Sequence, residues 1–318
     1  MKIVVLGAGA LGSILAGHLA RAGEDVILLA RGERATYLKE NGITVTGLVD
    51  FNTPCVITTD PGEISGADLL IVTVKTQDTD AALFSLAHAT FSSVISVQNG
   101  VRYNARLAAV FSEARTVGSS ASFSGEISSN GDARFTVNAG FFIGELPDGL
   151  SDRARNISAS LKNAGINSEV TANIRVFQWS KFAAWAAAAP VSILTRLVTY
   201  KWLSNPGSAL IFARIVREIA AIAAIQGIQV EDSPPLSIKS MVGGSEEEAV
   251  SLAQEMGAHF EVNAPEHRIS ALQDLERGRK LELEDTLGYA VDEAHRLGVP
   301  APTLESCYSL CSSVNQNI

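Results

Sequence analysis

One lysine in the second half of the chain lies in surroundings that suit proton transfer. Lys181 stands near the start of a helical pattern, Ile174–Ala188, that is otherwise rich in Ala, Trp and Phe. An ammonium group there could protonate a carbonyl oxygen as hydride arrives, because partial burial lowers its pKa toward the working range. A lysine that merely extends to solvent is the alternative. Glu282, at the predicted start of a helix over Leu281–Leu297, is by itself only a charge suited to a helix N-terminus.

Glycines near the N-terminus have the spacing of a phosphate-binding turn. A short apolar run precedes the sequence GAGALG at 7–12, and an alanine-rich helical pattern follows it. In that context Gly7 permits a sharp turn, Gly9 lets a pyrophosphate approach the backbone, and Gly12 lets the helix pack on the strand. The helix N-terminus adds N–H groups and a positive dipole end. We therefore expect a dinucleotide to bind at Gly7, Gly9, Ala10, Leu11 and Gly12.

The end of the next predicted strand, Asp25–Ala30, distinguishes between the nicotinamide cofactors. An NAD site usually carries Asp or Glu there to hold the ribose hydroxyls. This chain has Arg31 instead, and a guanidinium can pair with a 2′-phosphate and stack on adenine. The pattern favours NADP(H) over NAD. Two observations leave room for other readings: Glu33 could fold back onto the ribose, and Arg31 could be a solvated surface charge.

Two polar residues follow predicted strands of the first half. Lys75 comes directly after the apolar run Asp68–Val74, and Asn99 follows Val94–Val97. The carboxyl ends of parallel strands deliver side chains to a ligand, so Lys75 could bind a phosphate or a substrate carboxylate, and Asn99 the ribose or nicotinamide. The alternatives are a solvated lysine and an asparagine that supports a left-handed turn before Gly100.

Composition and charge exclude several classes of function. The chain has 318 residues, of which 47% are hydrophobic and 19% charged, enough for two domains with substantial cores. Its net charge of -9 argues against a nucleic-acid surface. The longest later apolar run, Phe182–Leu194, is too short to span a bilayer and contains Pro190, so we expect a cytoplasmic protein. Its three cysteines have no spacing typical of zinc or of a redox pair, and we expect no metal.

The character of the chain changes near Thr171. Before it, strand and helix patterns alternate, and the continuous apolar run Asp68–Val74 is typical of a central parallel strand. After it, the patterns are helical: Ile174–Ala188, Pro206–Gln226, Ser245–Met256, Ser270–Gly278 and Leu281–Leu297. The loop 229–244, which contains Pro234 and Pro235, is predicted to bend and to be exposed.

These patterns predict an α/β protein. We expect an N-terminal Rossmann domain, a doubly wound sheet over residues 1–171, followed by an all-helical C-terminal substrate and catalytic domain over 172–318. The active site is expected in the cleft between the two domains.

Together these motifs resemble those of the ketopantoate reductase (2-dehydropantoate 2-reductase) family over nearly the whole chain. The matching motifs are G-x-G-x-x-G at 7–12, Arg31, V-T-x-K at 72–75, Q-N-G at 98–100, W-x-K at 179–181 and S-x-L-Q-D-x-x-x-G-R-x-x-E at 270–282. The resemblance implies NADPH as hydride donor and a small 2-keto acid as acceptor, with 2-dehydropantoate reduced to pantoate in pantothenate biosynthesis. It also implies roles for individual residues: Lys181 as catalytic lysine, Glu282 as cleft glutamate, Ser270 as substrate contact, and Lys75 and Asn99 at the nicotinamide end.

One departure from the family pattern concerns the substrate. The family usually has asparagines one and two turns beyond the lysine on the same helix face, where this chain has Trp185 and Ala189. The hydroxyl of the substrate would then lack partners unless Ser192 or a backbone group replaces them. We therefore keep two alternatives: a reductase of a more apolar 2-keto acid, and a non-catalytic NADP-binding regulatory protein. The retained Lys181 and Glu282 argue against the second. A dehydrogenase of the 3-hydroxyacid type is disfavoured by the 270–282 motif, and a homodimer is left open.

Overall fold

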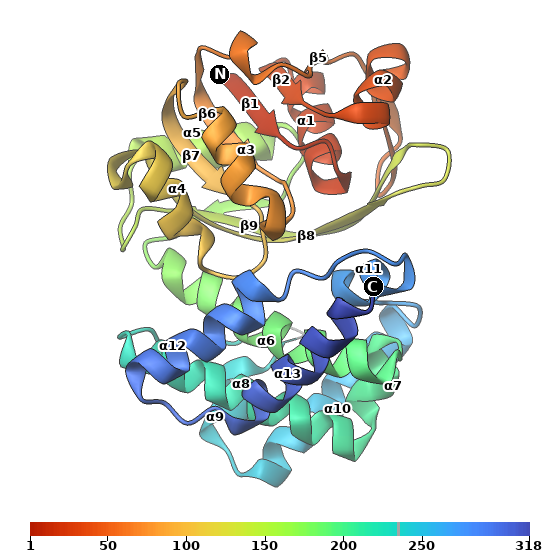
Figure 1. The fold of residues 1–318 in the computed structure, drawn as a ribbon, viewed down its shortest axis with the longest axis vertical. Helices are drawn as coiled ribbons and strands as arrows, with labels where there is room; N and C mark the ends of the chain where they lie inside the picture. The colour runs from red at the N-terminus through yellow and green to blue at the C-terminus, as the bar shows by residue number, and fades with distance from the viewer. Residues whose placement is uncertain (234–235) are drawn as a thin grey trace. The chain divides into compact units, whose positions relative to one another are not determined.

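The chain forms two compact units that do not follow one another simply along the sequence (Figure 1). The computed structural model describes residues 1–233 and 236–318, so Pro234 and Pro235 of the predicted exposed loop lie outside the described residues. Unit 1 consists of Met1–Gln98 and Tyr103–Arg175, and unit 2 of Asn99–Arg102 and Val176–Ile318. The chain therefore passes from one unit to the other at three places. The assignment of roles to the segments 1–171 and 172–318 stays a prediction.

The first sheet of unit 1 is parallel, with the strand order β5–β2–β1–β6–β7. Its strands are β1 (Lys2–Leu6), β2 (Asp25–Leu29), β5 (Val56–Thr58), β6 (Gly66–Val72) and β7 (Thr90–Ser96). Helices α1 (Ala10–Arg21), α2 (Gly32–Asn41), α3 (Thr79–Ser85) and α4 (Tyr103–Phe111) lie between or after these strands. The central strand β1 is almost entirely buried, as expected of a strand with helices on both faces. The predicted Rossmann-type fold class is confirmed.

A second, mixed sheet lies in unit 1, and the sequence analysis did not predict it. It has the order β10 (Ser168–Val170), β9 (Ala133–Gly144), β3 (Ile43–Gly47) and β4 (Phe51–Thr53), with β8 (Gly118–Ile127) paired antiparallel to β9. The later strands therefore do not extend the doubly wound sheet. Helix α1 packs against this second sheet, and at Gly17 an added Cβ would lie 2.9 Å from the Ile43 side chain. Helix α5 (Asp152–Asn163) precedes β10.

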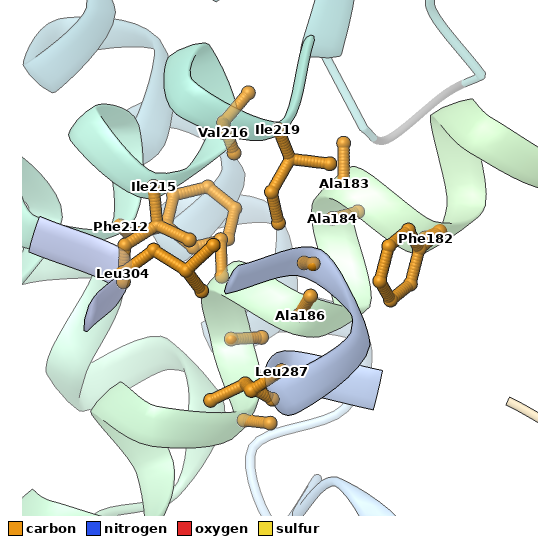
Figure 2. Packing of buried hydrophobic residues seen from close by; sticks show 14 of the residues in the cluster. Phe182, Ala183, Ala184, Ala186, Phe212, Ile215, Val216, Ile219, Leu287 and Leu304 are labelled. Atoms are coloured by element: carbon orange, nitrogen blue, oxygen red, sulfur yellow. The ribbon is translucent and has the colours of Figure 1, made fainter. Parts of the chain in front are cut away.

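Unit 2 is helical throughout its described residues apart from its connecting segments and one isolated β-bridge. Its helices are α6 (Ile174–Thr195, whose first two residues belong to unit 1), α7 (Thr199–Ser204), α8 (Pro206–Ile225), α9 (Ile238–Gly243), α10 (Glu246–Asn263), α11 (Ser270–Glu276), a π-helical turn (Glu284–Gly288), α12 (Tyr289–Leu297) and α13 (Pro302–Gln316). Figure 2 shows side chains of α6 and α8 packed together, with Leu287 and Leu304 beside them. Among the described residues, no helix is long and apolar enough to cross a membrane.

Several predicted boundaries in unit 2 are wrong. Helix α10 continues to Asn263, beyond the predicted end at Met256, and the loop predicted as exposed over 229–244 contains α9, in which Ile238 and Met241 are buried. The prediction ended the first helix at Ala188, before Pro190, yet α6 continues to Thr195. A proline inside a helix costs about 3 kcal/mol, and here the segment around it, including Ala189, Val191 and Ile193, is buried in the apolar core. Burial of this face offsets the missing backbone hydrogen bond. The last predicted helix begins at Glu284 rather than at Leu281, so Glu282 lies just before it in irregular backbone.

Candidate functional site

The glycine-rich turn of unit 1 has the geometry that a dinucleotide-binding loop needs. Gly7 follows β1 with a φ of +110°, and an added Cβ would lie 2.8 Å from Val74. At Gly12, in the first turn of α1, an added Cβ would lie 1.9 Å from the carbonyl oxygen of Gly7. At Gly9, by contrast, an added Cβ would meet no atom within 4 Å. The turn is therefore closed by packing at its two ends and open toward space at Gly9.

Helix α1 begins at this open side without a capping side chain. Gly9 is the N-cap residue, no side chain accepts a hydrogen bond from the first turn, and that turn has no acidic residue. The N–H groups of Ala10, Leu11 and Gly12 lack partners within the helix, since the first intrahelical bond runs from the N–H of Ser13 to the carbonyl of Gly9. Uncapped N–H groups and the positive dipole end favour an anion.

Two side chains that were not predicted as site residues hold this turn in place. The Thr73 hydroxyl lies 2.8 Å from the carbonyl oxygen of Gly7 and 3.0 Å from that of Leu6. The Arg34 guanidinium donates to the carbonyl of Ala8 at 3.1 Å and to the Ser13 hydroxyl at 2.9 Å. The sequence contained a signal for each, since Thr73 lies in V-T-x-K and Arg34 one turn beyond Arg31. Neither signal could be separated from an ordinary surface residue without the fold.

The other arginine of this region, Arg31, lies at the end of β2 where it was predicted. It is the N-cap residue of α2 and is exposed. Arg34 on the next turn, by contrast, is half-buried and also donates to the carbonyl of Gly131 at 2.5 Å. Arg31 therefore has the accessibility that binding of a phosphate requires, whereas Arg34 has a structural role in the turn.

Lys75 lies just beyond β6, in a loop fixed by a buried glutamine. Lys75 is half-buried at the start of a short 3-10 turn, Thr76–Asp78. The side-chain amide of Gln98, at the end of β7, donates to the carbonyl of Val74 at 2.9 Å and to the Thr79 hydroxyl at 2.6 Å. Gln98 is only 7% exposed. The first residue of the Q-N-G motif thus ties together the ends of two adjacent strands.

Asn99, the second residue of that motif, belongs to unit 2 although the strand before it belongs to unit 1. The next residue, Gly100, has a φ of +89°, and an added Cβ there would lie 2.9 Å from the carbonyl oxygen of Asp285. Arg102 forms an ion pair with the Asp285 carboxylate at 3.1 Å. The left-handed backbone conformation therefore lies at Gly100 itself, where this segment contacts the rest of unit 2.

Helix α6 carries the predicted catalytic lysine on the face that also includes Trp185 and Ala189. Lys181 is half-buried, and burial lowers its pKa to about 8, while the negative charge of Glu282 partly offsets this shift. Trp185 is partly buried against the core of unit 2, and Ala189 is completely buried. A primary amine with a pKa near 8 is mostly protonated at neutral pH and is a stronger acid than an ordinary lysine.

Two further predicted residues lie in unit 2 after α10. Glu282 is 8% exposed and lies close enough to Lys181 to influence its pKa. Ser270 is the first residue of α11 and is half-buried. Unit 2 therefore brings together an amine and a carboxylate that are separated by about a hundred residues of sequence. The roles assigned to Ser270, Trp185 and Ala189 in substrate binding stay predictions.

A parallel sheet with an open glycine turn and a following helical unit defines a Rossmann-type α/β protein with a helical C-terminal region. Comparison with known families gives the identification. The family model "Ketopantoate reductase PanE/ApbA" matches residues 3–148, and "Ketopantoate reductase PanE/ApbA C terminal" matches residues 173–315. The chain therefore belongs to the ketopantoate reductase PanE/ApbA family, a family of oxidoreductases. The resemblance inferred from the motifs is confirmed.

Individual relatives are similar to this chain over nearly their whole length. A 2-dehydropantoate 2-reductase from Archaeoglobus fulgidus is 28% identical over 317 residues, which are 100% of this chain and 99% of the relative. The crystal structure of 2-dehydropantoate 2-reductase from Methylococcus capsulatus superposes with a TM-score of 0.81 at 26% identity, covering 100% of this chain and 97% of that one. A D-mandelate dehydrogenase, solved with NADH and anilino(oxo)acetate, shares the fold with a TM-score of 0.85 at 18% identity, covering 100% and 99%.

Proposed function

We propose that this chain reduces a 2-keto acid to a 2-hydroxy acid with NADPH, with 2-dehydropantoate as the first candidate substrate. The observation that carries the proposal is the pair of Lys181 and Glu282 in unit 2. Burial brings the pKa of Lys181 down to about 8. General acids work best when their pKa lies near the operating pH, because they are then protonated and still acidic enough to give up the proton.

In this proposal Lys181 and Glu282 of unit 2 carry out the proton transfer. The Lys181 ammonium donates a hydrogen bond to the carbonyl oxygen of the substrate and protonates the alkoxide as it forms. Glu282 keeps the ammonium charged and oriented, since its carboxylate favours the protonated form. A partly buried ammonium stabilises developing negative charge more strongly than one in bulk water.

Unit 1 fits the cofactor. NADPH, when bound, would supply the hydride. The space beside Gly9 and the uncapped N–H groups of Ala10, Leu11 and Gly12 suit a pyrophosphate. Arg31, exposed at the end of β2, would pair with the 2′-phosphate, and the lack of a carboxylate at that position supports NADPH rather than NADH. Lys75 and Asn99 would lie at the nicotinamide end.

A second candidate substrate, a more apolar 2-keto acid, follows from the face of α6. One turn beyond Lys181 this face carries the partly buried indole ring of Trp185, and two turns beyond it lies Ala189, which is completely buried and offers a ligand no polar group. Neither can accept and donate hydrogen bonds as an amide does, so a substrate hydroxyl placed there would lose partners. A site built around such a hydroxyl rejects analogues lacking it by several orders of magnitude, whereas an apolar site shows little preference.

A matched pair of substrates tests both candidates. Trimethylpyruvate has the same carbon skeleton as 2-dehydropantoate and differs from it only in lacking the terminal hydroxyl group. Oxidation of NADPH with each acid gives two values of kcat/KM, and their ratio measures how much the site gains from that group. We expect turnover with at least one of the two acids. A ratio above about 10⁴ in favour of 2-dehydropantoate would show that a hydroxyl partner is present after all.

The variant Trp185→Asn sharpens this test, because it restores an amide at the position where the family usually has one. We expect it to shift the ratio toward 2-dehydropantoate. NADPH binding without turnover across a wider panel of 2-keto acids would instead support the non-catalytic regulatory protein. A homodimer and a cytoplasmic location stay predictions, of which the first is measured by light scattering of the purified protein.

A further inference from the structure

The short segment Asn99–Arg102 is attached to unit 2 by two contacts that converge on a single residue. Arg102 pairs with the Asp285 carboxylate at 3.1 Å, and the backbone of Gly100 approaches the Asp285 carbonyl so closely that an added Cβ would lie 2.9 Å from it. The Asp285 side chain is 9% exposed, whereas that of Arg102 is 43% exposed. Val101, between them, is buried in the apolar core of unit 2. The segment is therefore held by its side chains and by its main chain.

Asp285 lies on the same piece of backbone as Glu282. The Thr286 hydroxyl donates to the carbonyl of Glu282, and the N–H of Gly288 donates to the carbonyl of Leu283 at 2.9 Å. These bonds close the π-helical turn and connect it to the residues just before it. A displacement of Asp285 would therefore also displace Glu282, and the segment that bears Asn99 would move with both.

We propose that Arg102 and Asp285 are positioning residues that fix Asn99 in register with Glu282 and Lys181. The inference rests on the proposed function in one respect, namely that Asn99 contacts the nicotinamide or the substrate. Lys75, by contrast, is positioned within unit 1 through Gln98. Lys75 and Asn99, which come after adjacent strands, are thus positioned by different units. Asn99 therefore moves together with Lys181 and Glu282, the proposed proton-transfer residues.

The ion pair is suited to this role because it adds little to overall stability. The guanidinium of this pair is half-exposed, so water screens its attraction to Asp285 and the pair adds little to the stability of the fold. Misplacement of a contacting group by about 1 Å can nevertheless lower a reaction rate by about a hundredfold. Loss of the pair should therefore leave the fold nearly as stable as before and disturb the geometry at Asn99.

The test compares Arg102→Met with a matched control, Arg214→Met. Arg214 also belongs to unit 2 and forms an exposed ion pair, with Glu246 at 2.9 Å. We expect Arg102→Met to lower kcat about tenfold or more, with Tm and the Kd for NADPH close to those of the wild type. Arg214→Met should change kcat less than twofold, and Arg102→Lys, which keeps the charge, should recover part of the loss. Equal kcat values for Arg102→Met and Arg214→Met would overturn the proposal.

A double-mutant cycle shows whether Arg102 acts through Asn99. If it does, Arg102→Met should cost little further kcat once Asn99→Ala has removed the amide. Multiplicative losses would mean that the arginine has an independent role, and wild-type activity of Asn99→Ala would also contradict the proposal.

Hydrogen exchange gives a readout that does not depend on activity. The backbone amides of 99–102 should exchange at least about tenfold faster in Arg102→Met than in Arg214→Met, because the segment loses its ion pair with Asp285. Equal exchange would overturn the proposal even for an active enzyme. If the wild-type protein reduced no 2-keto acid, the proposed function would fail, while the exchange comparison would still decide whether the pair fastens this segment.

Discussion

The glycine turn of unit 1 and the lysine-bearing face of α6 in unit 2 differ in the kind of group that each could offer to a ligand. The turn offers backbone: Gly7 and Gly12 are packed too tightly for any side chain, and Gly9 leaves a space. The face of α6 offers a side chain whose chemistry depends on its surroundings, because burial and Glu282 together set the pKa of Lys181. In the proposed function, recognition in unit 1 would therefore depend on the shape of the backbone, and chemistry in unit 2 on the burial of Lys181.

This difference has a consequence for how each region responds to substitution. A backbone site is damaged by adding atoms, and the damage depends on whether the added atom meets protein or ligand. A side chain whose pKa is set by its surroundings loses its function when its charge or its charged neighbour is removed, with little effect on the rest of the fold. The two regions should therefore separate cleanly into binding defects and rate defects.

The largest expected effect is on the rate, from Lys181→Met. Removal of a general acid typically costs between about a hundredfold and ten thousandfold in kcat. We expect a loss of about a thousandfold, with the Kd for NADPH unchanged because the proposed contact of Lys181 is with the carbonyl oxygen of the substrate. Lys201→Met, at an exposed lysine of unit 2, is the control. Wild-type turnover by Lys181→Met would refute the role of the lysine.

The second effect separates the two kinds of glycine. Gly9→Ala adds a methyl group into empty space, so the protein should keep its Tm while the Kd for NADPH rises about a hundredfold. Gly12→Ala places its methyl group 1.9 Å from the Gly7 carbonyl oxygen, so it should lower both Tm and affinity. Gly243→Ala in unit 2, also next to open space, should change neither quantity. Normal NADPH binding by Gly9→Ala would exclude a pyrophosphate at this position.

A smaller effect concerns the choice of cofactor. Arg31→Met should raise the Kd for NADPH by about 10- to 100-fold, which corresponds to the loss of a charged hydrogen bond of roughly 1.5–3 kcal/mol. The Kd for NADH should stay within about twofold, since NADH has no 2′-phosphate to lose a partner. Isothermal titration with both nucleotides measures this ratio. Equal losses for the two would assign Arg31 to a part of the site that they share.

The smallest expected effect is a shift in pH dependence. If protonated Lys181 is the acid, kcat should fall as the pH rises through about 8, because the ammonium is lost there. Glu282 raises the pKa of Lys181, so Glu282→Gln should move this alkaline limb to lower pH. A limb that stays in place in Glu282→Gln would show that the carboxylate does not act on the lysine. A pH profile that is flat to pH 10 would point to a different proton donor.

Local features of the fold could be predicted from the sequence, and long-range pairing could not. The glycine turn depends on six consecutive residues, and the helix predicted to start at Ser245 is α10, which begins at Glu246 with Ser245 as its N-cap. The second sheet of unit 1 depends on the pairing of β3 with β9, which lie far apart in the chain. No local signal indicates which sheet a strand will join.

The candidate site was predictable to a similar extent. The motifs located Lys181, Glu282, Lys75 and Asn99, because each is part of a short pattern. The residues that hold them were missed, since Gln98 acts through the Val74 carbonyl and Arg102 through an aspartate 183 residues away. Such partners are ordinary polar residues until the fold brings them together. The helix through Pro190 was missed for a related reason, because only the surrounding core outweighs the local cost.

The threefold passage of the chain between the units limits how the protein can be divided. A fragment that ends after Arg175 would keep Asn99–Arg102 without the aspartate that receives it, and the complementary fragment would expose an apolar recess where Val101 belongs. Neither fragment on its own would contain all the contacts that its fold needs. Splitting the gene at this point should therefore yield two pieces that regain activity only when they are mixed.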